Sequence, residues 1–265
     1  MDLKGLQKTS IIADKEDNMR IIISPAKTMN VNNDSLQHQQ LPVFIKDTEV
    51  LLEELQKKTY DELKTIWNCS DKIATLNAER IRKMDLHHNL TPAILAFEGI
   101  QYKYMAPVVF ENNDFDYIEE HLRILSGFYG MLRPFDGVTP YRLEMQSRLN
   151  GEKVDSLYEF WNGKLAHQLF SESQCIVNLA SEEYSKCISR YSTENHHLLT
   201  CVFGEMKGEK VIEKGTLAKM ARGEMVRFMA ENKIENIQGL KKFNRLNYSF
   251  AEDLSDENRF TFIKK

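Results

Sequence analysis

The chain has 265 residues, of which 42% are hydrophobic and 28% are charged, so it can bury a sizeable core and an intrinsically disordered protein is excluded. Its 35 Lys and Arg residues stand against 39 Asp and Glu residues, a net charge of −4 that excludes a protein polycationic over its whole surface. Any surface that binds anions must therefore be local.

The N-terminal half is predicted to start with a polar extension, followed by a strand and several helices. Residues 1–18 have no apolar segment ahead of a small-residue cleavage site, so we expect a disordered extension and no secretory signal. The strand covers residues 21–23, and residues 44–56 have apolar side chains at helical spacing. Thr59 and Glu62 form a capping box that opens a second helix, and Ser70 or Asp71 can cap a third. Residues 92–97 are predicted as a buried strand.

The C-terminal half continues as a mixture of helices and strands. Asp114 can cap an amphipathic helix, and the three glycines and two prolines of residues 126–140 predict an ordered loop or a hairpin. A helix is expected over residues 157–170, and buried strands are expected over 174–180 and 198–203. A tight turn at 207–209 precedes a helix over 217–230, and short strands follow around Tyr248 and at 260–263. No repeat, linker or charge block divides the chain, so a single mixed α/β domain over residues 19–265 is predicted.

The first candidate site is the sequence Ser-Pro-Ala-Lys-Thr at residues 24–28, directly after a predicted strand. In α/β proteins, groups that bind ligands commonly follow the carboxyl ends of strands. Lys27 supplies a positive charge, and Ser24 and Thr28 supply hydroxyl groups, but the glycines of a phosphate-binding loop are missing. The alternative is a simple connection between strand and loop with a solvated lysine.

The second candidate site is the motif-rich segment of residues 125–145. Its candidate binding residues are Gly127, Gly130, Arg133, Tyr141 and Arg142. The glycines let the backbone approach a partner closely, the arginines can bind phosphates, and Tyr129 or Tyr141 can stack on a base or sugar. The alternative is a rigid packed loop in which Arg142 pairs with Glu144 or Asp136.

The third candidate site lies on the helix predicted over residues 217–230. Lys219 and Arg222 are three residues apart, so both lie on one face of the helix, and Gly223 permits close approach of another backbone. Residues 207–245 contain ten basic and five acidic side chains, a local surplus of five. The alternative is a solvated helix face on which neighbouring glutamates pair with Arg227.

Other polar groups give weaker signals. Residues 178–184 follow a buried strand, but Ser181 is also a good helix cap, and we favour that structural role. The adjacent histidines at 87–88 and 196–197 lack partners at a metal-ligand spacing, so we predict neither a metal site nor a cofactor. No known catalytic motif is present, so the catalytic residues are unknown and an enzymatic activity is left open.

Cysteine usage and hydropathy indicate the cytoplasm. The cysteines Cys69, Cys175, Cys187 and Cys201 never approach a Cys-x-x-Cys spacing, so we expect reduced thiols without disulfides. The longest uncharged apolar runs are far shorter than the roughly 20 residues that a membrane helix needs. We therefore expect a cytoplasmic protein that does not contact a membrane.

Several motifs, in the same order, resemble the YaaA family of peroxide stress proteins. They occupy residues 24–28, 96–102, 125–145, 157–161, 178–184 and 221–223, and the most specific is Leu-Ser-Gly-x-Tyr-Gly-x-Leu-Arg-Pro from Leu125. The resemblance runs from Met19 almost to the C-terminus. It implies a compact α/β domain of the family's own fold, in a bacterial protein that limits peroxide damage, lowers free intracellular iron and binds DNA through a positively charged cleft.

The resemblance also implies a helix-hairpin-helix element, which we assign to residues 125–133 because glycines lie there beside a helical pattern. The chain departs from the family pattern in three places. It has the extension before Met19, Lys242 where the family tends to have glycine, and Ile100 where it tends to have aspartate. We therefore assign none of the family's contacts to these positions in this chain.

Together these observations predict binding of duplex or branched DNA, without strong sequence preference, through phosphate contacts in one cleft. The cations expected to line it are Lys27, Arg133, Arg142, Lys219 and Arg222, supported by Ser24, Thr28, Gly127, Gly130, Tyr141 and Gly223. The alternative is an enzyme that acts on a nucleotide or modified nucleobase in the same cleft, with Glu144 or Asp136 as the acid-base group. A deep closed pocket would favour the enzyme, whereas a long open groove would favour DNA. Direct iron binding is a third hypothesis, for which no ligand set is visible.

Overall fold

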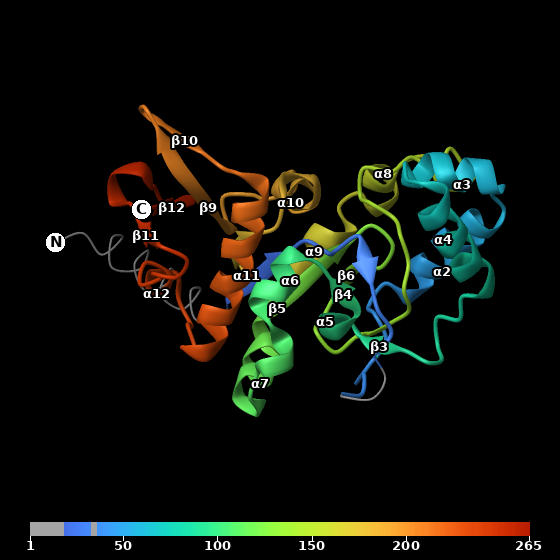
Figure 1. Ribbon diagram of the computed structural model, residues 1–265, viewed down its shortest axis with the longest axis horizontal. Helices are drawn as coiled ribbons and strands as arrows, with labels where there is room; N and C mark the ends of the chain where they lie inside the picture. Colours follow the sequence, from blue (N-terminus) through green and yellow to red (C-terminus); the bar gives the residue numbers. More distant parts are fainter. Residues whose placement is uncertain (1–18, 33–35) are drawn as a thin grey trace.

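The structure is a computed structural model that describes residues 19–32 and 36–265. The expected N-terminal extension, residues 1–18, lies outside the described residues. The described chain forms a mixed α/β domain, which confirms the predicted fold class (Figure 1). Helices α2 (Ile45–Gln56), α3 (Tyr60–Trp67) and α4 (Asp71–Lys83) gather at one end of the molecule, beyond the edge of the large sheet.

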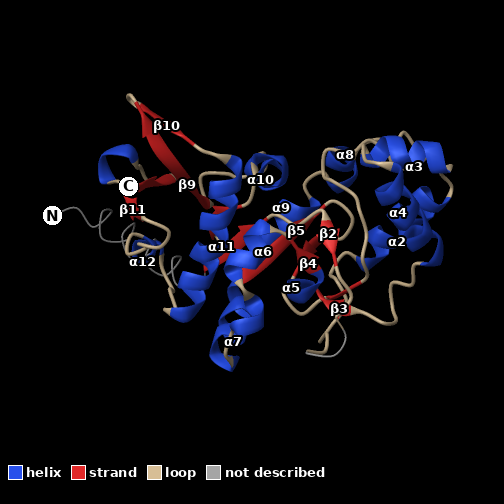
Figure 2. Cartoon of the chain, in the orientation of Figure 1, coloured by secondary structure: helices blue, strands red, loops and turns tan. Residues whose placement is uncertain are grey.

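An eight-stranded sheet organises the domain, and its strands are among those drawn red in Figure 2. The strand order is β11-β12-β9-β8-β1-β5-β6, and β10 pairs with β9. The strands from β12 to β5 in this order run parallel, whereas β6, β10 and β11 pair antiparallel with their neighbours. The strands are β1 (Met19–Ile23), β5 (Leu122–Ser126), β6 (Gly130–Leu132), β8 (Cys175–Leu179), β9 (His197–Lys207), β10 (Lys210–Ile212), β11 (Tyr248–Phe250) and β12 (Arg259–Lys264).

The central strands β1, β5 and β8 are almost entirely buried because helices cover both faces of the sheet. Helices α6 (Ile100–Met105), α7 (Asn112–His121) and α11 (Gly215–Glu231) pack together on one face, and α9 (Lys164–Glu172) packs against α10 (Glu182–Ser189) on the other (Figure 1). Strands buried on both faces need nearly continuous apolar side chains. This requirement explains the apolar runs from which β1 and β8 were predicted.

Several short elements complete the domain. They are α5 (Ala93–Ala96), α8 (Leu157–Trp161), α12 (Ile237–Leu240), the 3-10 helices Pro107–Val109 and Glu252–Leu254, and the strand pairs β2 (Thr28–Met29) with β4 (Phe97–Glu98) and β3 (Thr91–Pro92) with β7 (Gly137–Val138). In residues 19–32 and 36–265, no helix has both the length and the apolar composition needed to cross a bilayer.

Two local signals are confirmed in detail. At the start of α3, Glu62 N donates to Thr59 Oγ1 at 3.3 Å and Thr59 N donates to Glu62 Oε2 at 2.8 Å, which is the predicted capping box. Gly208 has φ of +62° and forms the turn of the predicted hairpin between β9 and β10. Both features depend on interactions between residues close in sequence, so the rest of the fold does not change them.

Three local predictions are wrong. The segment 92–97, expected to be one strand, contains helix α5 between two short strands. The prediction failed because a short apolar run fits both the helical and the strand periodicity. The helix expected over 157–170 is split, since Asn162 has φ of 42° and ends α8 before α9 begins. Helix α7 begins at Asn112, and Asp114 is the third residue of the helix, where it closes a capping box with Glu111.

Candidate functional site

The chain order of the strands reverses at β1. After β1 the chain adds β5 on one side, and later β8, β9 and β12 on the other. In open α/β sheets, ligands commonly bind outside the carboxyl ends of the strands at such a switch point. The segments that leave β1 and β8 meet there, because Ser181 N donates to Ser24 Oγ at 2.8 Å and the two hydroxyl oxygens lie 3.1 Å apart.

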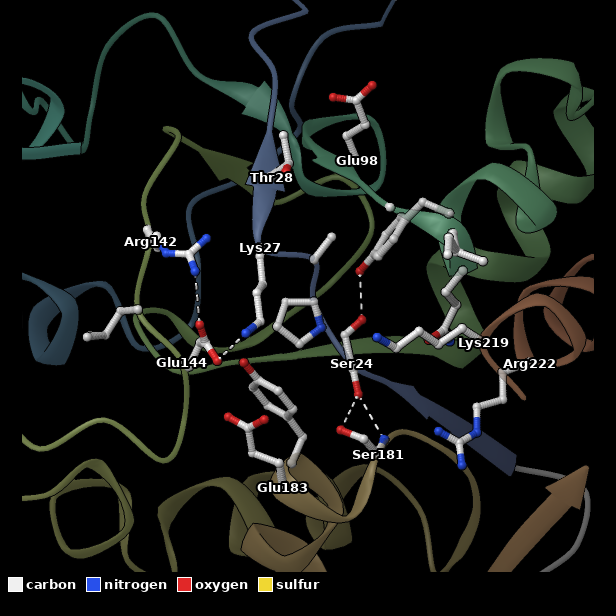
Figure 3. Close-up of a pocket in the computed structure, with 18 of the residues that line it drawn as sticks. Ser24, Lys27, Thr28, Glu98, Arg142, Glu144, Ser181, Glu183, Lys219 and Arg222 are labelled. Carbon is white, nitrogen blue, oxygen red and sulfur yellow. Dashed lines mark hydrogen bonds and ion pairs between the residues drawn. The ribbon is translucent and has the colours of Figure 1, made fainter. Parts of the chain in front are cut away.

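A pocket of about 300 Å³, the central pocket, opens at this switch point (Figure 3). It is lined by residues 24–28 after β1, 98–102 around the start of α6, the loop 141–144, the start of α10, and α11. The predicted binding residues that line it are Ser24, Lys27, Thr28, Tyr141, Arg142, Lys219 and Arg222. The structure therefore brings together four of the five predicted cations from three separate parts of the sequence.

Arg133 does not line the central pocket, so the expectation of one cleft for all five cations is wrong at this residue. It lines a separate cavity of about 70 Å³, where its Nε lies 3.3 Å from Asp136 Oδ1. Asp136 is buried there, and burial raises the pKa of its carboxyl to about 6. Asp136, a predicted acid-base candidate, is thus also remote from the central pocket. Sequence proximity to Arg142 does not fix the direction in which either side chain points.

Glu144 pairs with two of the cations in the central pocket. Its carboxylate lies 2.7 Å from Lys27 Nζ and 3.3 Å from Arg142 Nη2. The Lys27 side chain is 64% exposed, whereas those of Arg142 and Glu144 are 12% and 16% exposed. The pairing of Arg142 with Glu144, considered above as an alternative to ligand binding, is therefore present. A ligand phosphate would have to compete with this carboxylate for both cations.

Helix α11 presents Lys219 and Arg222 from the opposite wall (Figure 3). Arg222 Nη2 lies 3.5 Å from Glu213 Oε1, and the Arg222 side chain is 14% exposed. Burial lowers the pKa of Arg222, but a guanidinium stays charged at neutral pH. Lys219 is exposed, and it forms no ion pair with any described carboxylate. Lys219 is thus the cation of this pocket that is most accessible to a ligand.

None of the three predicted glycines lines the pocket, but two of them position the segments that do. A Cβ at Gly127 would lie 2.6 Å from a main-chain carbonyl oxygen of the loop 141–144, so glycine lets this loop pack on the turn after β5. A Cβ at Gly223 would lie 2.1 Å from the carbonyl oxygen of Gln101, so α11 touches α6 there. Gly130 has φ of +74°, a conformation that favours glycine. A Cβ at Gly130 would lie 2.9 Å from Leu165 and Trp161, outside the pocket, so Gly130 supports the fold and only Gly127 and Gly223 support the site through packing.

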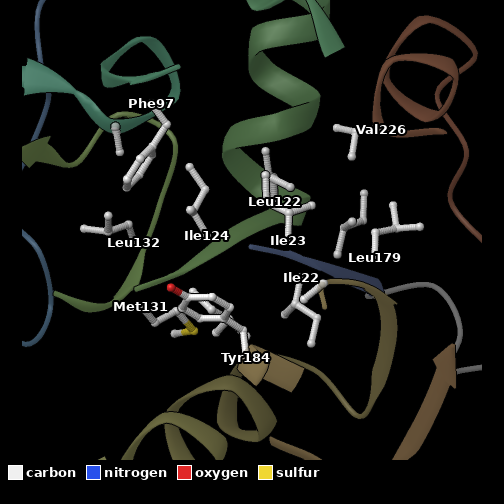
Figure 4. Close-up of a cluster of buried hydrophobic side chains, with 14 of the residues drawn as sticks. Ile22, Ile23, Phe97, Leu122, Ile124, Met131, Leu132, Leu179, Tyr184 and Val226 are labelled. Atoms are coloured by element: carbon white, nitrogen blue, oxygen red, sulfur yellow. The ribbon is translucent and has the colours of Figure 1, made fainter. Parts of the chain in front are cut away.

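Tyr141 and Tyr184 belong to the apolar layer beneath the pocket. Tyr141 is 4% exposed and its hydroxyl lies 2.6 Å from Ser126 Oγ, so its ring has little free surface for stacking on a base, contrary to expectation. Figure 4 shows Tyr184 on the α10 side of the sheet and Leu122 and Ile23 near α7 on the other side. These side chains are buried in the core, where Tyr184 also lines the pocket whereas Leu122 and Ile23 do not.

Sequence reasoning missed Glu183 and Glu98, which bring two further carboxylates to the pocket. Burial, reinforced by repulsion from Glu144, raises the pKa of Glu183. Ser181 is the N-cap residue of α10, as predicted, but its side chain makes no capping hydrogen bond and faces Ser24. The position of Glu183 just past the end of β8 was a usable signal, but the capping role assigned to Ser181 took precedence over it.

A second cleft of about 640 Å³, the adjoining cleft, meets the central pocket at Lys27 and Glu144, which line both. Helix α3 and the residue after it line one part of this cleft, and residues 146–150 line another. Lys58 and Arg148 add positive charge, and Asp61 and Glu62 add negative charge. Lys58 lies 3.9 Å from Glu62, and Arg148 lies 3.8 Å from Asp155. The two clefts together extend from α11 to α3.

The expected helix-hairpin-helix element is not formed by residues 125–133. This segment contains the end of β5, a turn and β6, which pair as antiparallel strands. Two helices joined by a short connection occur instead at α3 and α4, linked by Asn68, Cys69 and Ser70. Asn68 has φ of 41° and ends α3, and it also lines the adjoining cleft.

Neither thiols nor metal ligands gather at the site. All four cysteines are free, and burial raises the pKa values of Cys187 and Cys201 to about 12. In the part of the chain that the structure describes, no three His, Cys, Asp or Glu side chains are grouped to hold a metal ion. His87 and His88 are exposed, and each lies beside a single carboxylate.

Comparison with known proteins places the chain in a family. Residues 19–254 match the family model described as peroxide stress protein YaaA. A UPF0246 protein of Lachnoclostridium phytofermentans is 58% identical over 246 residues, which cover 93% of this chain and 96% of the relative. UPF0246 proteins of Agathobacter rectalis and Desulfitobacterium hafniense are 54% and 53% identical, over 93% of this chain and 99% and 98% of their own lengths. The chain therefore belongs to the YaaA family of peroxide stress proteins.

Proposed function

We propose that this protein binds DNA through the central pocket and the adjoining cleft as its part in the peroxide stress response. One observation carries the proposal. Cations from three remote segments line one pocket, at a switch point, in a protein whose net charge is −4. Those cations are Lys27, Arg142, Lys219 and Arg222. A local cluster of this kind is the electrostatic footprint of a site for phosphates.

The continuity of the two clefts supports an extended ligand. Beyond Lys27, the cations Lys58 and Arg148 continue the path toward α3. A phosphate backbone that entered at α11 would meet these cations along the path, interspersed with the carboxylates of Asp61, Glu62 and Glu144. The α3–α4 pair lies at the far end of this path and could contact the backbone of a bound strand.

Contacts of this type predict how binding should behave. Phosphate contacts carry no direct sequence information, so duplex or branched DNA should bind with little sequence preference and strongly weaker affinity at high salt. Bound protein would shield DNA from oxidative damage in the cytoplasm. We further propose that the protein limits free intracellular iron, as the family resemblance implies.

A specific observation favours a second candidate, an enzyme that acts on a nucleotide or modified nucleobase. The central pocket, at about 300 Å³, is near the lower limit for small-molecule sites. Glu183 lines it, and burial raises the pKa of its carboxyl. A carboxyl group with a raised pKa in a pocket is suited to proton transfer. Of the two acid-base candidates considered earlier, only Glu144 lines this pocket.

The proposal is tested by titrating labelled DNA with the protein and following fluorescence anisotropy over a range of salt concentrations. Two unrelated duplexes and a four-way junction serve as ligands. Lys219→Ala should weaken binding by a similar factor for all three. The slope of log affinity against log salt should shrink by about one, because one phosphate contact is lost.

Arg227→Ala is the matched control for this titration. Arg227 lies on the same helix, its Nε donates to Glu231 at 2.7 Å, and it does not line the pocket. Its removal changes the net charge equally and should leave the affinity and the salt slope close to those of the wild type. DNA binding is refuted if the wild type fails to bind, and the assigned site is refuted if both variants bind alike.

A further inference from the structure

Resting on the proposed function, we infer that the central pocket accepts a single unpaired nucleotide. Its phosphate lies on the α11 side and the edge of its base lies on the side of Glu144 and Glu183. The pocket has three chemically distinct parts that match the three parts of a nucleotide. These parts are a cationic wall, a carboxylate wall and an apolar strip between them.

The cationic wall suits the phosphate. Lys219 is exposed and has no ion pair with a described carboxylate, and Arg222 stands one turn further along α11. The hydroxyl groups of Ser24 and Ser181 lie between these cations and the rest of the pocket (Figure 3). Phosphate oxygens accept hydrogen bonds from both kinds of group. Lys27 is less suitable for this role, because Glu144 is already 2.7 Å from its ammonium.

The carboxylate wall suits the edge of a base. Glu144 and Glu183 enter the pocket from the side opposite α11 (Figure 3). Lys27 and Arg142 pair with Glu144 there, so Glu183 is the carboxylate of this wall that has no ion pair with a described cation. A carboxylate only accepts hydrogen bonds, so it repels a phosphate and attracts the N–H groups of a base. Guanine, adenine and cytosine carry amino groups, and guanine also has a ring N–H on its pairing edge. The wall therefore favours bases that offer such donors and places the phosphate at the opposite end.

The apolar strip suits the face of a base. Pro25, Ala26 and Ile100 line the pocket, and Ile100 is 39% exposed although it begins helix α6. The strip is held tightly, because a Cβ at Gly99 would lie 3.0 Å from Ala26 Cβ. A flat base laid against these side chains would cover apolar surface that is otherwise open to water.

The size of the pocket excludes a stacked base pair. A volume of about 300 Å³ accommodates one nucleotide, whereas a base pair with its two backbones is much larger. A base inside duplex DNA can enter only after it leaves the stack, which is the route that enzymes acting on bases use. The ligand is therefore either a free mononucleotide or an unstacked nucleotide of DNA, and the two share the same recognition chemistry.

The experiment uses the full-length protein and a duplex with one bulged 2-aminopurine, whose fluorescence rises when the base leaves the stack. Fluorescence is read at saturating protein, with saturation established by anisotropy on the same duplex. We expect a rise of several-fold with the wild type. Glu183→Gln and Ile100→Ala should each lower this plateau by at least half. Arg227→Ala, which does not line the pocket, should match the wild type.

A parallel equilibrium dialysis with dGMP distinguishes the two sources of the nucleotide. If saturated DNA gives no fluorescence rise and dGMP does not bind, the inference is overturned while DNA binding itself stands. Binding of dGMP without any DNA binding supports the pocket assignment and refutes the proposed function. A plateau equal to that of the wild type in folded Glu183→Gln and Ile100→Ala, verified by circular dichroism, also overturns the inference.

Discussion

Replacing Gly223 with alanine should force helices α11 and α6 apart. The new Cβ would lie 2.1 Å from the carbonyl oxygen of Gln101, and real Cβ atoms essentially never come closer than 3.0 Å, so the helices must separate by about 0.9 Å. The opposing atoms belong to the backbone, so no side-chain rotation relieves the contact. Overpacking of this kind costs about 2–3 kcal/mol, and the better helix propensity of alanine returns up to about 1 kcal/mol.

The net expectation is a loss of about 1–2 kcal/mol in the free energy of unfolding, measured by urea titration with circular dichroism. Gly215→Ala is the matched control on the same helix, because a Cβ there meets no atom within 4 Å. It should be neutral or stabilising by up to about 1 kcal/mol. If the two variants are equally stable, the close approach of α11 to α6 is absent from the folded protein and the predicted loss of stability at Gly223 is refuted.

Three further predictions concern charge, thiols and pH. Glu144→Gln should free two cations and raise DNA affinity a few-fold, on the order of 1 kcal/mol, in the anisotropy assay; unchanged affinity would contradict this. Native protein should react quickly with a thiol reagent only at the partly exposed Cys69, because burial raises the pKa values of Cys187 and Cys201 to about 12; fast labelling of either, seen by mass spectrometry, would disprove it. Burial raises the pKa of Asp136 to about 6, against an ordinary value of 3.8, so the folded state binds a proton more tightly than the unfolded state does. This difference adds roughly 3 kcal/mol to the free energy of unfolding below about pH 4, and the contribution is lost as the pH rises through 6. Asp136→Asn should flatten the stability profile between about pH 4 and 6, and an unaltered profile would refute the raised pKa.

Local signals predicted the elements well wherever one physical cause dominates. The capping box of Thr59 and Glu62 and the glycine turn at Gly208 depend only on neighbouring residues, and both are present. The apolar segments of β1 and β8 are buried on both faces, so their composition alone indicated strands. Residues 92–97 were mistaken for a strand because six residues are too few to separate the helical period from the strand period.

The candidate site could be predicted only in part. Lys27 was found because it follows a strand, and Lys219 and Arg222 were found because they share a helix face. Nothing in the sequence shows which direction a loop side chain takes, so Arg133 was wrongly grouped with them. Glu183 was overlooked because residues 178–184 were assigned a capping role, and its place in the same pocket as Lys27 also depends on β8 lying next to β1, a pairing set by the topology of the whole sheet.

The dispersal of the pocket along the chain has a consequence for biosynthesis. Residues near Ser24 and those of α11 are almost two hundred positions apart, and β12, the last strand to be made, inserts between β9 and β11. A nascent chain that has emerged from the ribosome only as far as α10 has Lys27 and Arg142 but lacks the wall that carries Lys219. Domains fold as units, and long-range parallel pairing is slow. Ligand affinity would therefore appear only after α11 and β12 have been made, and chains truncated before α11 would bind DNA more weakly than chains that contain it.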